Sequence, residues 1–186
     1  MYLSDPEDYK AVQILLSFNE SISEMCVDIP IEDDLISEDP QSFTVTITSN
    51  DTDVSFMRPI ANITIIDNDN ITIGFDREVY SINEDQRSVE VCAVITEGSL
   101  QREVVVVLST QDGSAKSPED YTSISVPLTF DDVTVLQCVN ITLENDMILE
   151  GVEEFEVVLD SMNEPRIILD PGIAQVDITD DDSKIV

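Results

Sequence analysis

Short acidic clusters are the parts of this sequence whose residue types could do chemistry. Two of them end apolar, β-rich runs: Asp67-Asn68-Asp69 follows 63–66, and Asp180-Asp181-Asp182 follows 176–179. Carboxylate and amide oxygens are the ligands that Ca²⁺ prefers, about six to eight at a time. The clusters also fit plain turns or inter-domain linkers, because Asp and Asn favour turns.

The overall charge indicates a cation as ligand and argues against other partners. The 186 residues include 40 Asp and Glu against 8 Lys and Arg, a formal net charge of −32. Nucleic acid and anionic lipid surfaces would be repelled, and no apolar run is long enough for direct membrane insertion. General solubility is the alternative explanation of so acidic a chain.

The composition offers little support for an enzyme. The chain has no His, no Gly-x-Ser-x-Gly elbow and no glycine-rich phosphate loop, so a nucleophile–base pair or a nucleotide fingerprint is missing. Carboxylates alone can hydrolyse glycosides. Such sites usually contain aromatic platforms, however, and only 5% of these residues are aromatic. We expect no enzymatic activity.

An internal repeat sets the domain organisation. Pro6-Glu7-Asp8-Tyr9 recurs as Pro118-Glu119-Asp120-Tyr121, and at the same offset Cys26 corresponds to Cys138 and Phe43 to Phe155. We expect a complete unit over 71–182, the C-terminal part of another over 1–70, and the start of a further linker or strand at 183–186. The sequence is then expected to be a fragment, or a partial gene model, of a longer tandem array.

Apolar residues within each unit alternate with period two, which predicts strands rather than helices. The complete unit should contain seven strands, near 71–83 (bent at Asp76-Arg77), 88–95, 103–110, 124–130, 136–143, 154–160 and 174–180. The first unit should contain the last four of that set, near 11–18, 25–31, 42–48 and 61–67. Only 104–108 is apolar without alternation, which predicts a central strand covered on both faces. The predicted fold class is all-β, with tandem immunoglobulin-like antiparallel sandwiches.

These motifs, in this order, resemble a Calx-beta domain, the repeat of the Na⁺/Ca²⁺ exchanger regulatory loop and of many extracellular adhesion proteins. The resemblance is carried by Ile73-Gly74-Phe75, Tyr80-Ser81-Ile82-Asn83-Glu84, Asp112-Gly113-Ser114-Ala115, Asp120-Tyr121, Glu150-Gly151-Val152-Glu153-Glu154-Phe155 and Val176-Asp177-Ile178-Thr179-Asp180. Pro118 stands where the family has a Gly before the Asp-Tyr pair, and the Gly expected after Phe130 is missing. Both departures affect loops only.

The resemblance implies Ca²⁺ bound by acidic loops at one pole of the sandwich. The implied ligands in the complete unit are Glu84, Asp120, Asp146, the main-chain carbonyl of Ile148, Glu150, Glu153, Asp180, Asp181 and Asp182. In the first unit they are Asp8, Asp33, Asp34, Glu38, Asp67 and Asp69. Gln41 and Asn68 replace two carboxylates there, so the first site should be weaker, because fewer charges lower the affinity.

The cysteines and glycosylation motifs indicate an extracellular protein. Cys92 and Cys138 fall on the outer faces of neighbouring strands in an immunoglobulin-type topology, which predicts a disulfide between them; three free thiols in a reducing compartment are the alternative. Asn-x-Ser/Thr sequons stand at Asn19, Asn50, Asn62, Asn70 and Asn140, each a candidate glycosylation site.

We therefore expect a Ca²⁺-binding Calx-beta segment of a larger extracellular or cell-surface protein, in which Ca²⁺ stiffens the array for cell adhesion or cell communication. Its expected partners are neighbouring units of the same chain and extracellular matrix or cell-surface proteins. Two alternatives remain: a cytosolic Ca²⁺ sensor attached to a membrane transporter, and a structural spacer that binds no metal.

Overall fold

The structure is a computed structural model that describes residues 8–182. The described chain divides into two compact units: residues 8–34 with 39–67 form the first, and residues 35–38 with 68–182 form the second. Among the described residues the regular structure is almost entirely β, with η1 (Glu84–Gln86), a single-turn 3₁₀ helix, as the exception. No helix in this part of the chain has the length and apolar character needed to cross a membrane.

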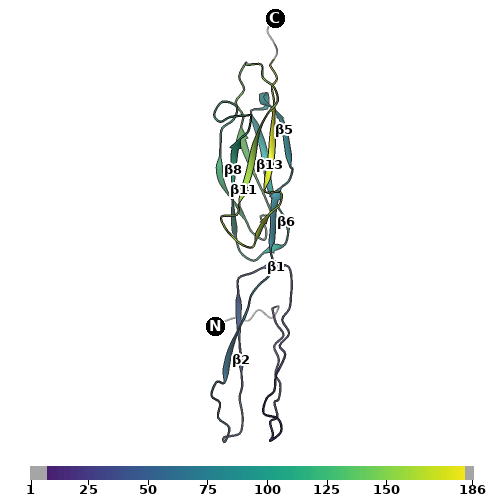
Figure 1. The fold of residues 1–186 in the computed structure, drawn as a ribbon, viewed down its shortest axis with the longest axis vertical. Helices are drawn as coiled ribbons and strands as arrows, with labels where there is room; N and C mark the ends of the chain where they lie inside the picture. The colour runs from purple at the N-terminus through teal and green to yellow at the C-terminus, as the bar shows by residue number, and fades with distance from the viewer. Residues whose placement is uncertain (1–7, 183–186) are drawn as a thin grey trace. The chain divides into compact units, whose positions relative to one another are not determined.

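The second unit is a sandwich of two sheets (Figure 1). The four-stranded sheet has the order β10-β6-β4-β12, and the five-stranded sheet has the order β5-β13-β11-β8-β9. The strands are β4 (Ile71–Phe75), β5 (Val79–Asn83), β6 (Ser88–Glu97), β8 (Val104–Asp112), β9 (Ser125–Phe130), β10 (Leu136–Thr142), β11 (Glu153–Asp160), β12 (Ile167–Leu169) and β13 (Ile173–Thr179). A separate two-stranded ladder joins β1 (Ile36–Ser37) to β7 (Ser99–Leu100).

The all-β sandwich predicted from the alternation is confirmed. Each of the seven predicted runs of the second unit contains a strand, but the bent run 71–83 forms two, β4 and β5, which lie in different sheets. The break falls at Asp76 and Arg77, where the chain leaves one sheet and enters the other. The short strands β7 and β12 were not predicted, since two or three residues cannot display a period.

One core fills the space between the sheets, and all its members lie between Ile71 and Ile178. Tyr121 and Phe155 stack at its centre with ring centroids 4.1 Å apart, and both are fully buried. The expectation that 104–108 is covered on both faces is wrong: Val105 is 40% exposed whereas Val106 is fully buried. A two-layer sandwich buries only one face of each sheet, so the outer valines reflect β propensity rather than burial.

The first unit has less regular structure than the sequence predicts. β2 (Gln41–Thr46) and β3 (Ile60–Ile65) pair antiparallel at two of the four predicted positions. The runs 11–18 and 25–31 form no strand in the described structure, and Ile14 and Phe18, on the alternating apolar face, are 52% and 58% exposed. Alternation gives a segment one apolar and one polar face. A stable strand also needs a neighbouring strand to pair with and a hydrophobic core to cover. Tyr9 and Phe43 nevertheless stack at 4.0 Å, as their repeat counterparts do in the second unit.

Candidate metal centre

Three strand ends meet at one pole of the second unit and bring acidic residues together. β5 and β13 run parallel, with Asn83 opposite Thr179, so the next residues, Glu84 and Asp180, emerge side by side. β11 runs antiparallel to β13 and begins at the same pole with Glu153. Sheet register alone therefore assembles carboxylates from three distant parts of the sequence.

A buried tyrosine places a fourth carboxylate, that of Asp120. The neighbouring Tyr121 is fully buried, and its hydroxyl donates a 2.7 Å hydrogen bond to Oδ1 of Asp112. The carbonyl of Asp120 accepts a 2.9 Å hydrogen bond from the amide of Glu144, and its carboxylate accepts one from the amide of Lys116. The Asp-Tyr pair thus has one residue fixed in the core and the other held at the pole.

The carboxylates form two adjoining groups. The first comprises Glu84, Asp180 and Asp182, and the second comprises Asp120, Glu150 and Glu153; in each, one oxygen from every residue lies within 4.8 Å of the others. The groups are linked, because the amide of Glu150 donates a 2.7 Å hydrogen bond to Oδ2 of Asp180. This spacing brings several oxygens within reach of a divalent ion in each group.

The electrostatics of the pole disfavour ionised carboxylates in the absence of a cation. Burial, followed by the nearby aspartates at 180, 181, 182 and 146, raises the pKa of Glu84 from 4.5 to about 7. Burial and neighbouring acids likewise raise the pKa values of Glu150, Glu153 and Asp182. Like charges in a poorly solvated site make the protonated form favourable, and a bound cation would remove this cost.

Two oxygens indicate that these residues fit a cation. Oε1 of Glu84 and Oδ2 of Asp182 are buried and have no hydrogen-bond partner among the described residues. Glu84 as a whole is only 5% exposed. Buried polar atoms without partners are uncommon, and an ion is one of the few things that satisfies a carboxylate oxygen among other carboxylates.

The remaining sequence-predicted ligands of this unit lie near the two groups but outside them. Oδ1 of Asp146 accepts a 2.7 Å hydrogen bond from the amide of Ile148, which is 61% exposed. Oδ1 of Asp181 accepts a 3.3 Å hydrogen bond from the side-chain amide of Asn145. Glu144 also lines the small hollow of the pole and was not predicted. Its position directly after a strand, beside the Asp-Tyr loop, was the available signal.

The residues predicted as ligands of the first unit do not gather in the same way. They are Asp8, Asp33, Asp34, Glu38, Asp67 and Asp69, and within 8–182 none of them belongs to a group of three acidic side chains as close as those above. Two of these residues, Glu38 and Asp69, belong in the structure to the compact second unit. The counterpart of Glu84, on the strand equivalent to β5, is not part of 1–70.

Cys92 and Cys138 form a disulfide, the pairing predicted from the sequence. They face each other directly across the antiparallel pair β6–β10, with Cα atoms 4.0 Å apart. Cys26 is a free, exposed thiol. All five sequon asparagines, at 19, 50, 62, 70 and 140, are exposed.

The fold and the site together define a class: a two-sheet immunoglobulin-like sandwich with an acidic pole. The model of the Calx-beta domain matches residues 4–69 and 67–182, so the chain belongs to the Calx-beta domain family. The predicted resemblance is thereby confirmed, and the chain has two matched segments.

Known relatives agree with this assignment. Human FRAS1-related extracellular matrix protein 2 is 31% identical over 96% of the chain, which spans only 6% of that protein. The crystal structure of the apo form of the Calx CBD1 domain is 29% identical, with a TM-score of 0.56, over 61% of this chain and 100% of that one. The calcium binding domain CBD12 of CALX1.1 is also 29% identical, with a TM-score of 0.55, over 59% of this chain and 44% of that one.

Proposed function

We propose that the second unit binds Ca²⁺ at its acidic pole. The observation that carries the proposal is the pair of buried, unpartnered oxygens on Glu84 and Asp182. Glu84, Asp180 and Asp182 would hold one ion, and Asp120, Glu150 and Glu153 would complete a second, adjoining position. Carboxylate oxygens in this number suit Ca²⁺, whereas the chain has no His to favour zinc or copper.

Binding of Ca²⁺ would make the loops of the acidic pole more rigid. Without a cation the carboxylates repel one another, and the loop between β10 and β11 exposes Met147, Ile148 and Val152 to solvent. A cation that binds only the folded form stabilises it by mass action. In the array, the effect would be to stiffen successive units for cell adhesion or cell communication. The function is thus binding and structural rather than catalytic.

The proposed location is outside the cell, as part of a larger protein. The Cys92–Cys138 disulfide and the five exposed sequons support it, because such bonds and such glycans form in the secretory pathway. The relation to an extracellular matrix protein supports it further. The proposed partners are neighbouring Calx-beta units and extracellular matrix or cell-surface proteins.

Thermal unfolding tests the calcium proposal. The whole chain is melted in millimolar Ca²⁺ and in chelator, alongside Glu150→Ala and the control Glu156→Ala, which removes an exposed carboxylate of β11 away from the pole. We expect Ca²⁺ to raise the Tm of the wild type and the control, and to raise that of Glu150→Ala much less. An unchanged wild-type Tm would favour a metal-free spacer instead.

Expression through the secretory pathway tests the location. Glycosidase treatment should lower the apparent mass of the secreted chain, and non-reducing peptide mapping should recover the Cys92–Cys138 bond. If the chain carries no glycan and both thiols are free, the cytosolic sensor becomes the better explanation.

A further inference from the structure

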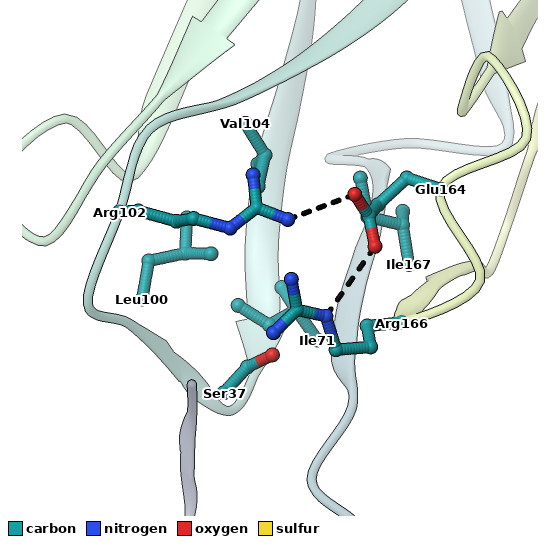
Figure 2. A pocket seen from close by; sticks show the side chains of 8 residues that line it. All are labelled: Ser37, Ile71, Leu100, Arg102, Val104, Glu164, Arg166 and Ile167. Atoms are coloured by element: carbon teal, nitrogen blue, oxygen red, sulfur yellow. Dashed lines mark hydrogen bonds and ion pairs between the residues drawn. The ribbon is translucent and has the colours of Figure 1, made fainter. Parts of the chain in front are cut away.

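A socket in the second unit is built around two of the few basic residues of this acidic chain. Figure 2 shows Glu164 between Arg102 and Arg166. Nη2 of Arg102 lies 2.9 Å from one carboxylate oxygen of Glu164, and Nε of Arg166 lies 3.3 Å from the other. This arrangement fixes both guanidinium groups next to β7, with Ser37 and Leu100 also lining the socket.

The socket holds the segment Leu35–Glu38. β1 pairs in parallel with β7, with Ile36 opposite Ser99, and Ser37, opposite Leu100, is only 4% exposed. Glu38 completes the contact. Its carbonyl accepts a hydrogen bond from Arg166, and its carboxylate accepts one of 2.6 Å from the side-chain amide of Gln101.

The internal repeat gives this segment a counterpart later in the sequence, residues 147–150, which we call the docking segment. At the offset that aligns the two units, Ile36 corresponds to Ile148 and Glu38 to Glu150. In the described structure the docking segment forms no strand, and Met147 and Ile148 are 91% and 61% exposed. An exposed apolar run beside an acidic pole is costly unless something covers it.

We propose that the docking segment adds a strand to the edge of a following Calx-beta unit, as Leu35–Glu38 does in this one. The repeat defines the partner of the docking segment. That partner is a unit with an edge strand like β7 and arginines equivalent to Arg102 and Arg166. Strand addition satisfies main-chain groups at the edge. The equivalent of Arg166 would bind the carbonyl of the glutamate, as Arg166 does for Glu38, and the equivalent of Gln101 would bind its carboxylate.

The proposal does not depend on calcium. The contacts of Glu38 in the socket are hydrogen bonds, from Arg166 to its carbonyl and from the side-chain amide of Gln101 to its carboxylate. Glu150, however, belongs both to the docking segment and to a candidate cation group. Each test is therefore run in Ca²⁺ and in chelator, so that failure of docking and failure of cation binding are distinguished.

Cysteine trapping in a tandem protein tests the proposal. A second copy of residues 70–182 is appended after Asp182, which keeps the chain separation between segment and socket nearly the same as for Leu35 and Ser99. The unit carries its own core, so the copy should fold. The test pair is Ile148→Cys with Ser99→Cys in the appended copy, in a Cys26→Ser background.

Two further pairs calibrate the result. The reference is Ile36→Cys with Ser99→Cys in the first copy, directly opposed in the structure. The negative control is Val133→Cys, which is 81% exposed, with Ser99→Cys in the appended copy. We expect the test pair to be oxidised to within about twofold of the reference and far more than the control. A test pair no better than the control, or a reference pair that does not form, overturns the proposal.

A variant of the acceptor adds a second readout. Arg166→Ala in the appended copy alone should reduce trapping of the test pair several-fold and leave the reference pair unchanged. Arg166→Lys should restore only part of it, since a lysine cannot reproduce the planar fork of an arginine. Equal trapping in all three proteins would contradict the assigned role of the socket.

Discussion

Replacing Glu84 by glutamine should separate the two opposing effects of this carboxylate. In the absence of divalent cations the substitution removes a charge that is buried among aspartates, and the new amide can donate to Asp180, which a carboxylate cannot. In Ca²⁺ it removes one of the proposed charged ligands. We therefore expect Glu84→Gln to stabilise the cation-free protein and to weaken its response to Ca²⁺.

The raised pKa sets the size of the first effect. Burial and the surrounding aspartates move the pKa of Glu84 from 4.5 to about 7, and each unit corresponds to about 1.36 kcal/mol. At pH 8 the ionised side chain would cost the folded state at most about 3 kcal/mol. Solvent at the open pole screens part of this, so we expect a gain of about 1–2 kcal/mol, or a rise in Tm of about 3–8 °C.

The assay is thermal unfolding of Glu84→Gln, Glu156→Gln and wild type at pH 5 and pH 8, each with chelator and with Ca²⁺. Because the folded-state pKa of Glu84 is raised, the folded protein holds a proton that the unfolded chain has lost between pH 4.5 and about 7. The stability of cation-free wild type should therefore fall as the pH rises through this window. The Glu84→Gln protein should lose less stability over this pH range, and Glu156→Gln should lose as much as wild type.

Two results would refute the reasoning. If Glu84→Gln lowers the Tm in chelator at pH 8, the carboxylate is not under electrostatic strain in the folded state. If Ca²⁺ raises the Tm of Glu84→Gln as much as that of wild type, Glu84 is not a ligand.

Three other perturbations test the fold. Replacing Cys92 and Cys138 together by serine should reduce the free energy of unfolding by about 2–4 kcal/mol. If denaturant titration under non-reducing conditions gives the variant the same free energy of unfolding as wild type, this prediction is wrong. Phe155→Ala removes one half of the central stack and should cost about 3–5 kcal/mol, measured in the same titration, whereas Phe155→Leu should cost less. Gly74→Ala would place a Cβ against the main-chain carbonyl of Asp170. It should cost about 1–3 kcal/mol, and an unchanged Tm would show that the strands can move apart.

The sequence was most informative where a local period and a long-range repeat agreed. Alternation in the second unit located the main strands and placed Cys92 and Cys138 on outer faces, and the immunoglobulin-type topology placed their two strands side by side, as the structure has them. The first unit shows the limit of that reasoning. Val12, Ile14 and Phe18 alternate along one face as in a strand, yet they are 44%, 52% and 58% exposed. Periodicity describes the face that a strand would bury but not the sheet against which it would pack.

The candidate site was predicted less completely because strand ends and loops are set by tertiary contacts. Glu84 and Asp180 could be placed together through the family resemblance, and the parallel register of β5 and β13 supplies the physical reason. Glu144 was missed, since its place beside Asp120 depends on a main-chain hydrogen bond between loops. The pairing of β1 with β7 was also beyond the sequence, because two residues carry no period.

Different parts of the second unit build its core and its acidic pole. The stacked aromatic pair occurs in both units, as Tyr9 with Phe43 and Tyr121 with Phe155. Close groups of three carboxylates, by contrast, occur among the described residues only at the acidic pole of the second unit, one where β5 lies beside β13 and one at the start of β11. In the first of these groups the parallel pairing of β5 with β13 delivers the most buried carboxylate, that of Glu84. The acidic pole therefore depends on which strand ends the sheet register brings together, and not only on the number of acidic residues.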